Sequence, residues 1–201
     1  MESANDQIFV VLTAVFVIYV SYSIYQESDY FQLKCVISDV DKNTYCVRER
    51  KRVKEASDLL AQTATKLERL VAVMSQKAPD DPMVTRISKR FDARKIKEIL
   101  PTSEYTAYSE NKGEKLALCL NEKKEDAESR LIDPNTLMYV AMHELAHVGT
   151  VSIGHDSEFW ANFKRIIEFA AEADLYRPID YKKDNASYCG MKLTDNPYFD
   201  A

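Results

Sequence analysis

The chain contains 201 residues, of which 46% are hydrophobic and 29% charged, and its net charge is −5. The hydrophobic content excludes a disordered chain. Four cysteines in 201 residues are too few for a disulfide-dense small protein. The acidic balance makes a role in binding nucleic acid unfavourable, because such proteins usually carry an excess of Lys and Arg. The length allows one domain of roughly 150 residues with additional segments.

The chain begins with an uncharged apolar segment over residues 8–25, IFVVLTAVFVIYVSYSIY. As a helix it spans about 27 Å, which is just enough to cross the hydrocarbon core of a membrane. One alternative is a cleaved signal peptide, but Glu2 and Asp6 stand where such a peptide needs positive charge. The other is a buried core helix, for which this unbroken run is unusually long. We therefore expect an uncleaved transmembrane anchor over residues 1–27.

The orientation of this anchor follows from the flanking basic residues. No Lys or Arg precedes it, whereas Lys34 and Lys42 follow it, so the positive-inside rule predicts a C-terminal domain on the cytosolic side. That compartment is reducing, so the cysteines are expected to be free thiols. They are Cys35, Cys46, Cys119 and Cys189. The glycosylation-type triplet Asn-Ala-Ser at residues 185–187 is then expected to remain unmodified.

Residues 28–44 are predicted to form a juxtamembrane connector with a short strand over residues 31–37. A long helix is predicted over residues 45–76, where apolar residues recur at spacings of three and four. The basic run at residues 48–54 would lie in its first turns. Two interpretations of that run stay open: a solvated helix face, or a contact with anionic lipid headgroups.

A proline-rich break at residues 78–82 ends this helix, and a shorter helix is expected over residues 83–91. A β-hairpin should follow, with strands over residues 106–109 and 115–120 and a turn at Asn111-Lys-Gly113.

The next predicted helix carries the chemistry. Asp133 is a suitable N-cap, Pro134 a suitable first residue and Gly149 a suitable end. Another amphipathic helix is expected over residues 157–174. The tail over residues 176–201 should wrap around the domain.

All three histidines of the chain fall within one 13-residue window. His143 and His147 are four residues apart, so on a helix both imidazoles can reach one metal ion. Glu144 lies beside them, where it can act as a general base on metal-bound water. This spacing predicts a zinc site on a buried helix.

The third ligand must come from beyond this helix. His155 follows Gly154, which allows a tight turn back toward the metal, and it precedes the next helix. The alternative is a glutamate on that next helix, Glu168 or Glu172. We favour His155, because three neutral imidazoles leave one coordination position open for water, as catalytic zinc sites require.

His143-Glu-Leu-Ala-His147, followed by Gly154-His155 and then by Phe159-Trp160, resembles the zincin metallopeptidases of the WLM and SprT-like kind. Over roughly residues 45–195 the chain is also similar to small metallopeptidase-like proteins of large DNA viruses. The similar stretches include residues 111–115, 135–139 and 188–190, besides the N-terminal hydrophobic segment.

The resemblance implies an α+β fold: a zincin-like domain over residues 45–201, with a small antiparallel sheet and an active-site helix, preceded by a single transmembrane helix. It implies Zn²⁺ as cofactor, protein or peptide substrates, and a membrane-anchored enzyme in the virus particle. By analogy with zincins, the strand over residues 115–120 would pair with an extended substrate. Tyr181 and Tyr188 are candidates for stabilising the transition state.

Two other functions compete with this one. In the first, the protein is a non-catalytic structural membrane protein of a virus particle, and zinc only stabilises its fold. In the second, the protein cleaves proteins bound to DNA, against which the acidic charge and the membrane anchor both argue.

Overall fold

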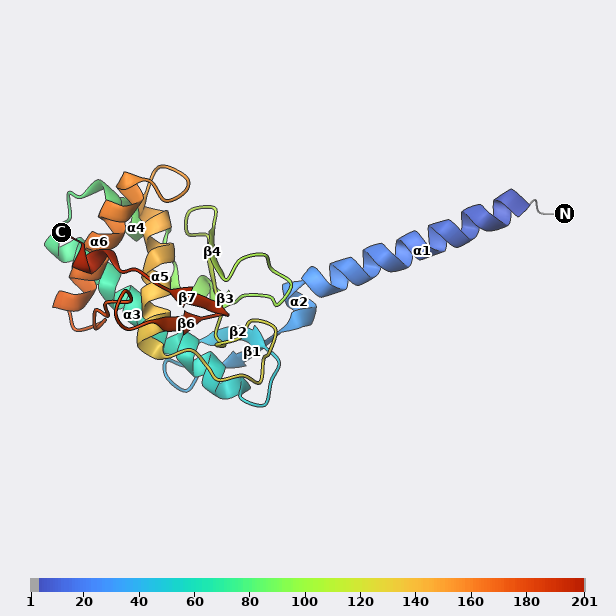
Figure 1. Cartoon of the computed structure of the whole chain (residues 1–201), viewed down its shortest axis with the longest axis horizontal. Coiled ribbons are helices and arrows are strands. Elements are labelled where there is room, and N and C mark those ends of the chain that lie inside the picture. The colour runs from blue at the N-terminus through green and yellow to red at the C-terminus, as the bar shows by residue number, and fades with distance from the viewer. Residues whose placement is uncertain (1–3, 201) are drawn as a thin grey trace.

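The computed structural model describes residues 4–200. The first three residues of the predicted anchor and the last residue of the predicted domain therefore lie outside the described residues. Helix α1 (Ala4–Glu27) extends away from the rest of the molecule as one straight rod (Figure 1). In the described part of the chain it is the one helix long and apolar enough to cross a membrane, and it is not buried against the domain. The predicted N-terminal apolar helix is thus confirmed.

A short helix and a hairpin connect α1 to the domain. Helix α2 (Asp29–Gln32) leads into β1 (Leu33–Ile37), which pairs antiparallel with β2 (Thr44–Arg48). The helix predicted from residue 45 is wrong at its start, because α3 begins only at Val53 and runs to Lys77. In β2 the alternate residues Tyr45 and Val47 are buried, which is the period of a half-buried strand rather than of a helix.

The expectation of free thiols is also wrong. Cys35 and Cys46 face each other across the β1–β2 hairpin and form a disulfide, with their Cα atoms 3.9 Å apart. Cys119 and Cys189 form the second, with their Cα atoms 6.0 Å apart. The expectation depended on the predicted side of the membrane. Pairing across 70 residues depends on tertiary structure, which spacing along the chain does not reveal.

Neither interpretation of the basic run at residues 48–54 holds for its first two arginines. Arg48 and Arg50 are buried, and both form ion pairs with Glu98, which is also fully buried. The backbone N–H of Arg48 donates to Glu98 at 2.7 Å, and both guanidinium groups donate to the side chain of Asn121. This cluster ties β2 to β3 (Ile96–Glu98) and to the loop that follows β5.

The central sheet has the strand order β3–β5–β4. Strand β5 (Lys115–Leu118) lies between β3, to which it is parallel, and β4 (Ala107–Glu110), to which it is antiparallel. The predicted hairpin is therefore present, and β4 is its outer strand. The short 3₁₀ helix η1 (Ala93–Lys95) precedes β3.

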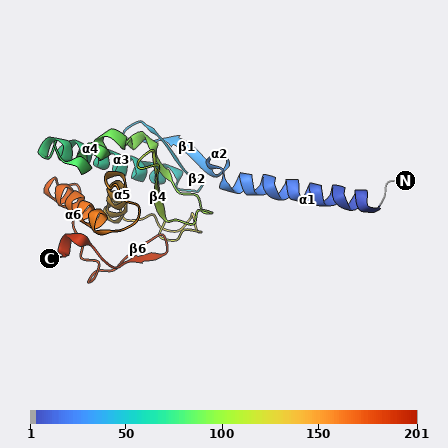
Figure 2. The same cartoon turned by 90° about the horizontal axis from the view of Figure 1, so that it is seen from above.

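Helix α5 (Pro134–Gly149) lies at the centre of the domain, with α6 on one side of it and β4 on the other (Figure 2). It packs against α3, α4 (Pro82–Arg90) and α6 (Ser157–Glu172). The Asp133 side chain accepts a hydrogen bond from the N–H of Thr136 at 2.9 Å, as an N-cap should. Gly149 is required for close approach: a Cβ there would lie 2.7 Å from Met83 Cγ of α4.

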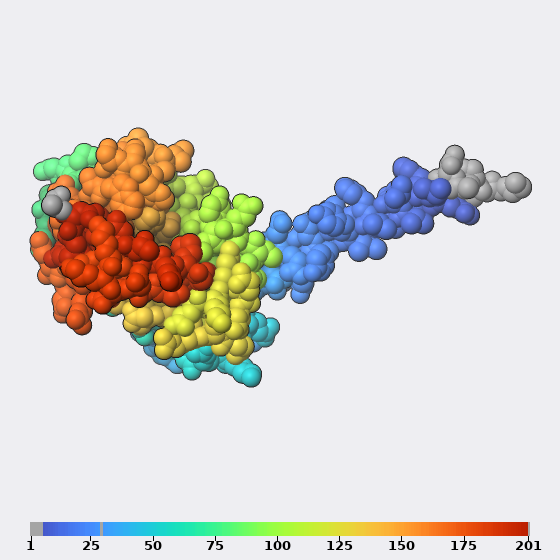
Figure 3. All heavy atoms as spheres, in the orientation of Figure 1, coloured from blue at the N-terminus to red at the C-terminus, as the bar shows by residue number. Residues whose placement is uncertain are grey.

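The C-terminal segment covers one face of the domain, where it is coloured red in the space-filling view (Figure 3). It forms a second small hairpin and a 3₁₀ helix, namely β6 (Ala186–Tyr188), β7 (Met191–Leu193) and η2 (Pro197–Phe199). The Tyr139 hydroxyl on α5 donates to the carbonyl of Asp195 at 2.8 Å. The expected wrapping tail is present.

We predict that Glu98→Gln destabilises the chain strongly, because it leaves two buried guanidinium groups without a carboxylate. The expected loss is about 3–5 kcal/mol in the free energy of unfolding. Glu49→Gln is the matched control, since Glu49 pairs with Lys34 on the surface, and its expected cost is below about 1 kcal/mol. Urea unfolding of the full chain in detergent measures both. Equal losses would contradict an internal role for the cluster.

We also predict that the two disulfides contribute unequally. Cys119→Ser with Cys189→Ser opens a link between residues 70 apart, whereas Cys35→Ser with Cys46→Ser opens one between residues 11 apart. The chain-entropy model gives about 4 kcal/mol for the first and about 3 kcal/mol for the second. Chemical unfolding of the two double variants tests this order, and a larger loss for the hairpin pair would contradict it.

Candidate metal centre

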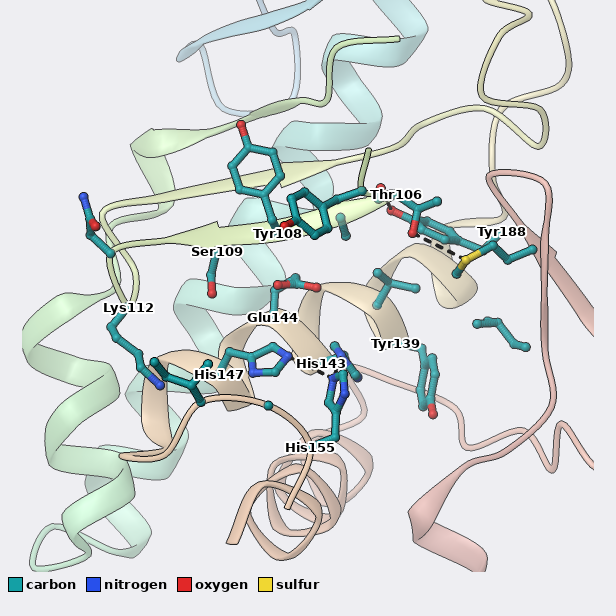
Figure 4. A pocket seen from close by; sticks show the side chains of 18 residues that line it. Thr106, Tyr108, Ser109, Lys112, Tyr139, His143, Glu144, His147, His155 and Tyr188 are labelled. Carbon is teal, nitrogen blue, oxygen red and sulfur yellow. Dashed lines mark hydrogen bonds between the residues drawn. The ribbon is translucent and has the colours of Figure 1, made fainter. Parts of the chain in front are cut away.

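Three imidazoles converge at one end of a cavity (Figure 4). His143 and His147 lie one turn apart on α5, and His155 belongs to the loop between α5 and α6. The Nε2 atom of His155 lies 3.0 Å from Nε2 of His143 and 3.2 Å from Nε2 of His147. Tetrahedral ligands at the usual zinc–nitrogen distance are about 3.3 Å apart. The donor set therefore fits a zinc ion.

Helix α6 supports the imidazoles with aromatic rings. Phe159 is fully buried, and its ring centroid lies 4.8 Å from that of His143 and 4.4 Å from that of His147. The Asp156 side chain caps α6 by accepting the N–H of Phe159 at 3.0 Å. The cap fixes the start of α6 at Ser157, two residues after His155, and so limits how far His155 can move away from α5.

Burial keeps the imidazoles of His143 and His147 neutral. It is the main cause that lowers the pKa of His143 to about 3 and the pKa of His147 to about 4, and neighbouring imidazoles act in the same direction. A neutral imidazole is the form that binds a metal ion. The Nε2 atoms of His143 and His147 both lie within hydrogen-bond distance of Nε2 of His155, and one cation could accept a lone pair from each of the three nitrogens.

The Glu144 side chain faces the cavity between the imidazoles and β4 (Figure 4). Burial raises its pKa to about 8, while a hydrogen bond from the backbone N–H of Ser109 acts in the opposite direction. A cation at the imidazoles would lower this pKa and favour the carboxylate. A cation held by the imidazoles and an ionised Glu144 carboxylate would therefore stabilise each other.

The cavity has a volume of about 640 Å³ and lies between α5, β4 and the C-terminal hairpin. Its apolar wall includes Tyr105, Val140, Ile153, Met191 and Leu193. Such a cavity, with a few polar groups at one end, has the size and character of a binding site for an organic substrate.

The alternative glutamate ligands do not reach this site. The carboxylate of Glu172 lies 2.7 Å from Nζ of Lys77, on another part of the surface. The cluster that could hold a metal ion contains the three histidines and neither Glu168 nor Glu172. The structure thus brings together the residues predicted from the sequence, with His155 in the third position.

The strand predicted to pair with substrate is the wrong one. Strand β5 is central, with β3 on one side and β4 on the other, so it has no free edge. Strand β4 is the edge strand, and the cavity is lined by its residues 107–109 and by Thr106 directly before it. The backbone groups of Thr106 and Tyr108 point toward β5 and bond with it. Backbone direction alternates along a strand, so the N–H and C=O groups of Ala107 and Ser109 point away from β5, toward α5.

The two candidate tyrosines have other roles. Tyr181 is fully buried against Tyr139, with ring centroids 4.9 Å apart, and it does not line the cavity. Tyr188 does line it, but its hydroxyl accepts the N–H of Cys119 at 2.9 Å and lies 3.2 Å from the Thr106 carbonyl, to which it donates. The Tyr181 hydroxyl therefore lies outside the cavity, and the Tyr188 hydroxyl is engaged by two backbone groups, so neither is placed to stabilise a transition state.

Lys112 lines the cavity, although the sequence predicts it only as a residue of the hairpin turn. Its Nζ donates to the carbonyls of Thr150 at 3.0 Å and Ser152 at 2.6 Å, so it holds the loop that carries His155. Burial lowers its pKa. The contact spans 38 residues, and no local pattern signals it.

Comparison with known proteins agrees with this geometry. The α+β fold and the helix with two histidines four residues apart are those of a zincin-like domain. The model of the WLM domain matches residues 41–197, and the chain belongs to this family. The resemblance stated from the sequence is confirmed.

The similar proteins come from large DNA viruses. Uncharacterized protein R325 of Acanthamoeba polyphaga mimivirus is 27% identical over 169 residues, covering 80% of this chain and 82% of that protein. Uncharacterized protein 136R of Invertebrate iridescent virus 6 is 36% identical over 59 residues, which are 29% of this chain and 33% of that protein. Uncharacterized protein 042R of Invertebrate iridescent virus 3 is 28% identical over 110 residues, 55% and 65% of the two chains. No solved structure matches the chain.

We predict that the full chain binds zinc in a one-to-one ratio and that His155→Ala reduces the affinity at least tenfold, because it removes one of three ligands. Glu172→Ala is the matched control, since it removes the rejected alternative ligand. Metal analysis and competition with a chromogenic chelator measure both variants. If Glu172→Ala released the metal while His155→Ala kept it, the assignment of the third ligand would be wrong.

Proposed function

We propose that this protein is a membrane-anchored zinc metallopeptidase. The observation that supports the proposal best is the meeting of three imidazoles and the Glu144 carboxyl group at one end of an open cavity. A purely structural zinc site is usually closed by a fourth protein ligand and needs no carboxyl group beside it. The family, whose members are zincin-like, supports the same proposal.

In this proposal His143, His147 and His155 hold the zinc ion. When bound, zinc polarises a carbonyl group and lowers the pKa of water. Glu144 takes the proton from the attacking water and then gives it to the leaving amine. Its burial and its hydrogen bond from Ser109 hold the carboxyl group in position for both transfers.

The substrate class follows from the edge of the sheet. An extended peptide can pair with β4, where Ala107 lies opposite Leu118 of β5 but directs its backbone N–H and C=O away from β5, toward the cavity side. Such pairing would run the scissile bond past the imidazoles and Glu144, because β4 lies along α5 at this point. Protein or peptide substrates are therefore the proposed class, and the apolar wall favours apolar side chains beside the cleaved bond.

The membrane part of the proposal rests on α1, whose apolar surface is exposed along its length. An uncleaved α1 would hold residues 45–201 close to the bilayer. The relatives are proteins of large DNA viruses, which supports a place in the membrane of a virus particle.

We expect Glu144→Gln to retain zinc and to lower kcat for peptide cleavage by about 10²–10⁴-fold, because the amide cannot accept the proton of water. The matched control is Glu172→Gln, a change on α6 outside the cavity, which should cleave like the parent chain. A peptide library read by mass spectrometry, together with metal analysis, measures both quantities on the same samples.

Cleavage by Glu144→Gln at the parental rate would contradict the proposed mechanism. A parent chain that binds zinc, unfolds on chelation and cleaves no peptide in the library would favour the non-catalytic structural role instead.

A further inference from the structure

All four cysteines of the chain are paired. One disulfide closes the β1–β2 hairpin, a few residues beyond the end of α1, and the other joins the end of β5 to the C-terminal hairpin. Disulfides form and persist in oxidising compartments and are rare in the cytosol. Two independent pairs without an unpaired cysteine therefore favour an oxidising environment for the domain.

The basic residues that favour the cytosolic side are few. They are Lys34 and Lys42 alone, because no other Lys or Arg occurs within about 20 residues of the end of α1. Long domains cross the membrane largely regardless of their charge. The later arginines Arg48 and Arg50 are engaged inside the domain by Glu98. The two disulfides are thus the stronger indication of the side on which the domain lies.

A second observation points to the same side of the membrane. Asn185-Ala186-Ser187 has the acceptor pattern for N-glycosylation. Asn185 and Ser187 are both exposed, at the start of β6 on the surface of the domain. Asn185 does not line the cavity, whereas Tyr188 and Met191 of the same hairpin do. A glycan on Asn185 would thus extend into solvent without entering the site.

We propose that Asn185 is an N-glycosylation site and that residues 28–201 lie on the non-cytosolic side of the membrane that α1 crosses. The proposal goes beyond the peptidase function and does not depend on it. It places the start of α1 toward the cytosol and the metal centre in an oxidising compartment or on the outside of a membrane.

Glycosylation of Asn185 and oxidation of the cysteines both use reactants of that compartment. Nδ2 of Asn185 forms a bond to the anomeric carbon of an oligosaccharide carried on a lipid diphosphate. The bond from that carbon to the diphosphate oxygen breaks, the lipid diphosphate leaves, and the amide releases one proton to the medium. For each disulfide, two thiols lose two protons and two electrons, and a disulfide carrier is reduced to its dithiol.

The test uses the full chain, translated in the presence of sealed microsomes that carry out glycosylation. The parent, Asn185→Gln, Ser187→Ala and Ser187→Thr are compared by gel mobility before and after treatment with an N-glycosidase. Ser187→Thr is the matched control for Ser187→Ala, because it changes the same exposed residue and keeps the acceptor pattern. Protease added outside the microsomes reports independently where the domain lies.

We expect a single glycosidase-sensitive shift in the parent and in Ser187→Thr, none in Asn185→Gln or Ser187→Ala, and protection of the domain from protease in all four. Digestion of an unshifted domain by external protease would overturn the proposal, even if its disulfides had formed through a thiol oxidase of the cytosol. A protected domain without a glycan would overturn the assignment of Asn185.

Discussion

The burial of α5 is the constraint on which the rest of the domain depends. This helix carries two imidazoles and a carboxyl group, yet twelve of its sixteen residues are buried. An unpartnered polar group in such surroundings costs several kcal/mol. The fold meets this cost by turning all three polar side chains to one cavity, where His155 and the N–H of Ser109 reach them.

Two close contacts fix how the neighbours of α5 approach it. Gly149 lets α4 pack directly on the end of the helix, because any larger residue would bring its Cβ into the side chain of Met83. Gly113, in the turn between β4 and β5, has φ +110° and lies against Val148, where a Cβ would come within 2.9 Å of Cγ1. The turn therefore rests on α5 and brings Lys112 to the loop of His155.

Local chemistry made much of this site predictable. The cap at Asp133, the end of the helix at Gly149 and the spacing of His143 and His147 are all encoded within one stretch of the chain, and the structure agrees with each of them. His155 was predictable because it lies so near in sequence. The helix that starts at residue 157 also follows from its own apolar period.

The features that sequence reasoning missed depend on distant partners. Strand β2 resembles the start of a helix until β1 and Glu98 are in place beside it. The order β3–β5–β4 decides which strand has a free edge, and that order is set by a parallel pairing with a segment before the hairpin. The disulfide partners of Cys46 and Cys119 are likewise matters of tertiary proximity.

The second disulfide relates the cavity of the candidate metal centre to the proposed location of the domain. It holds the C-terminal hairpin against the end of β5, and the Tyr188 hydroxyl at that junction bridges the N–H of Cys119 and the carbonyl of Thr106. These contacts fix the wall of the cavity that faces β4, and Met191 of the same hairpin lines it. Reduction of this bond would remove the covalent link between this wall and the end of β5. An oxidising compartment would therefore supply a structural element of the cavity itself.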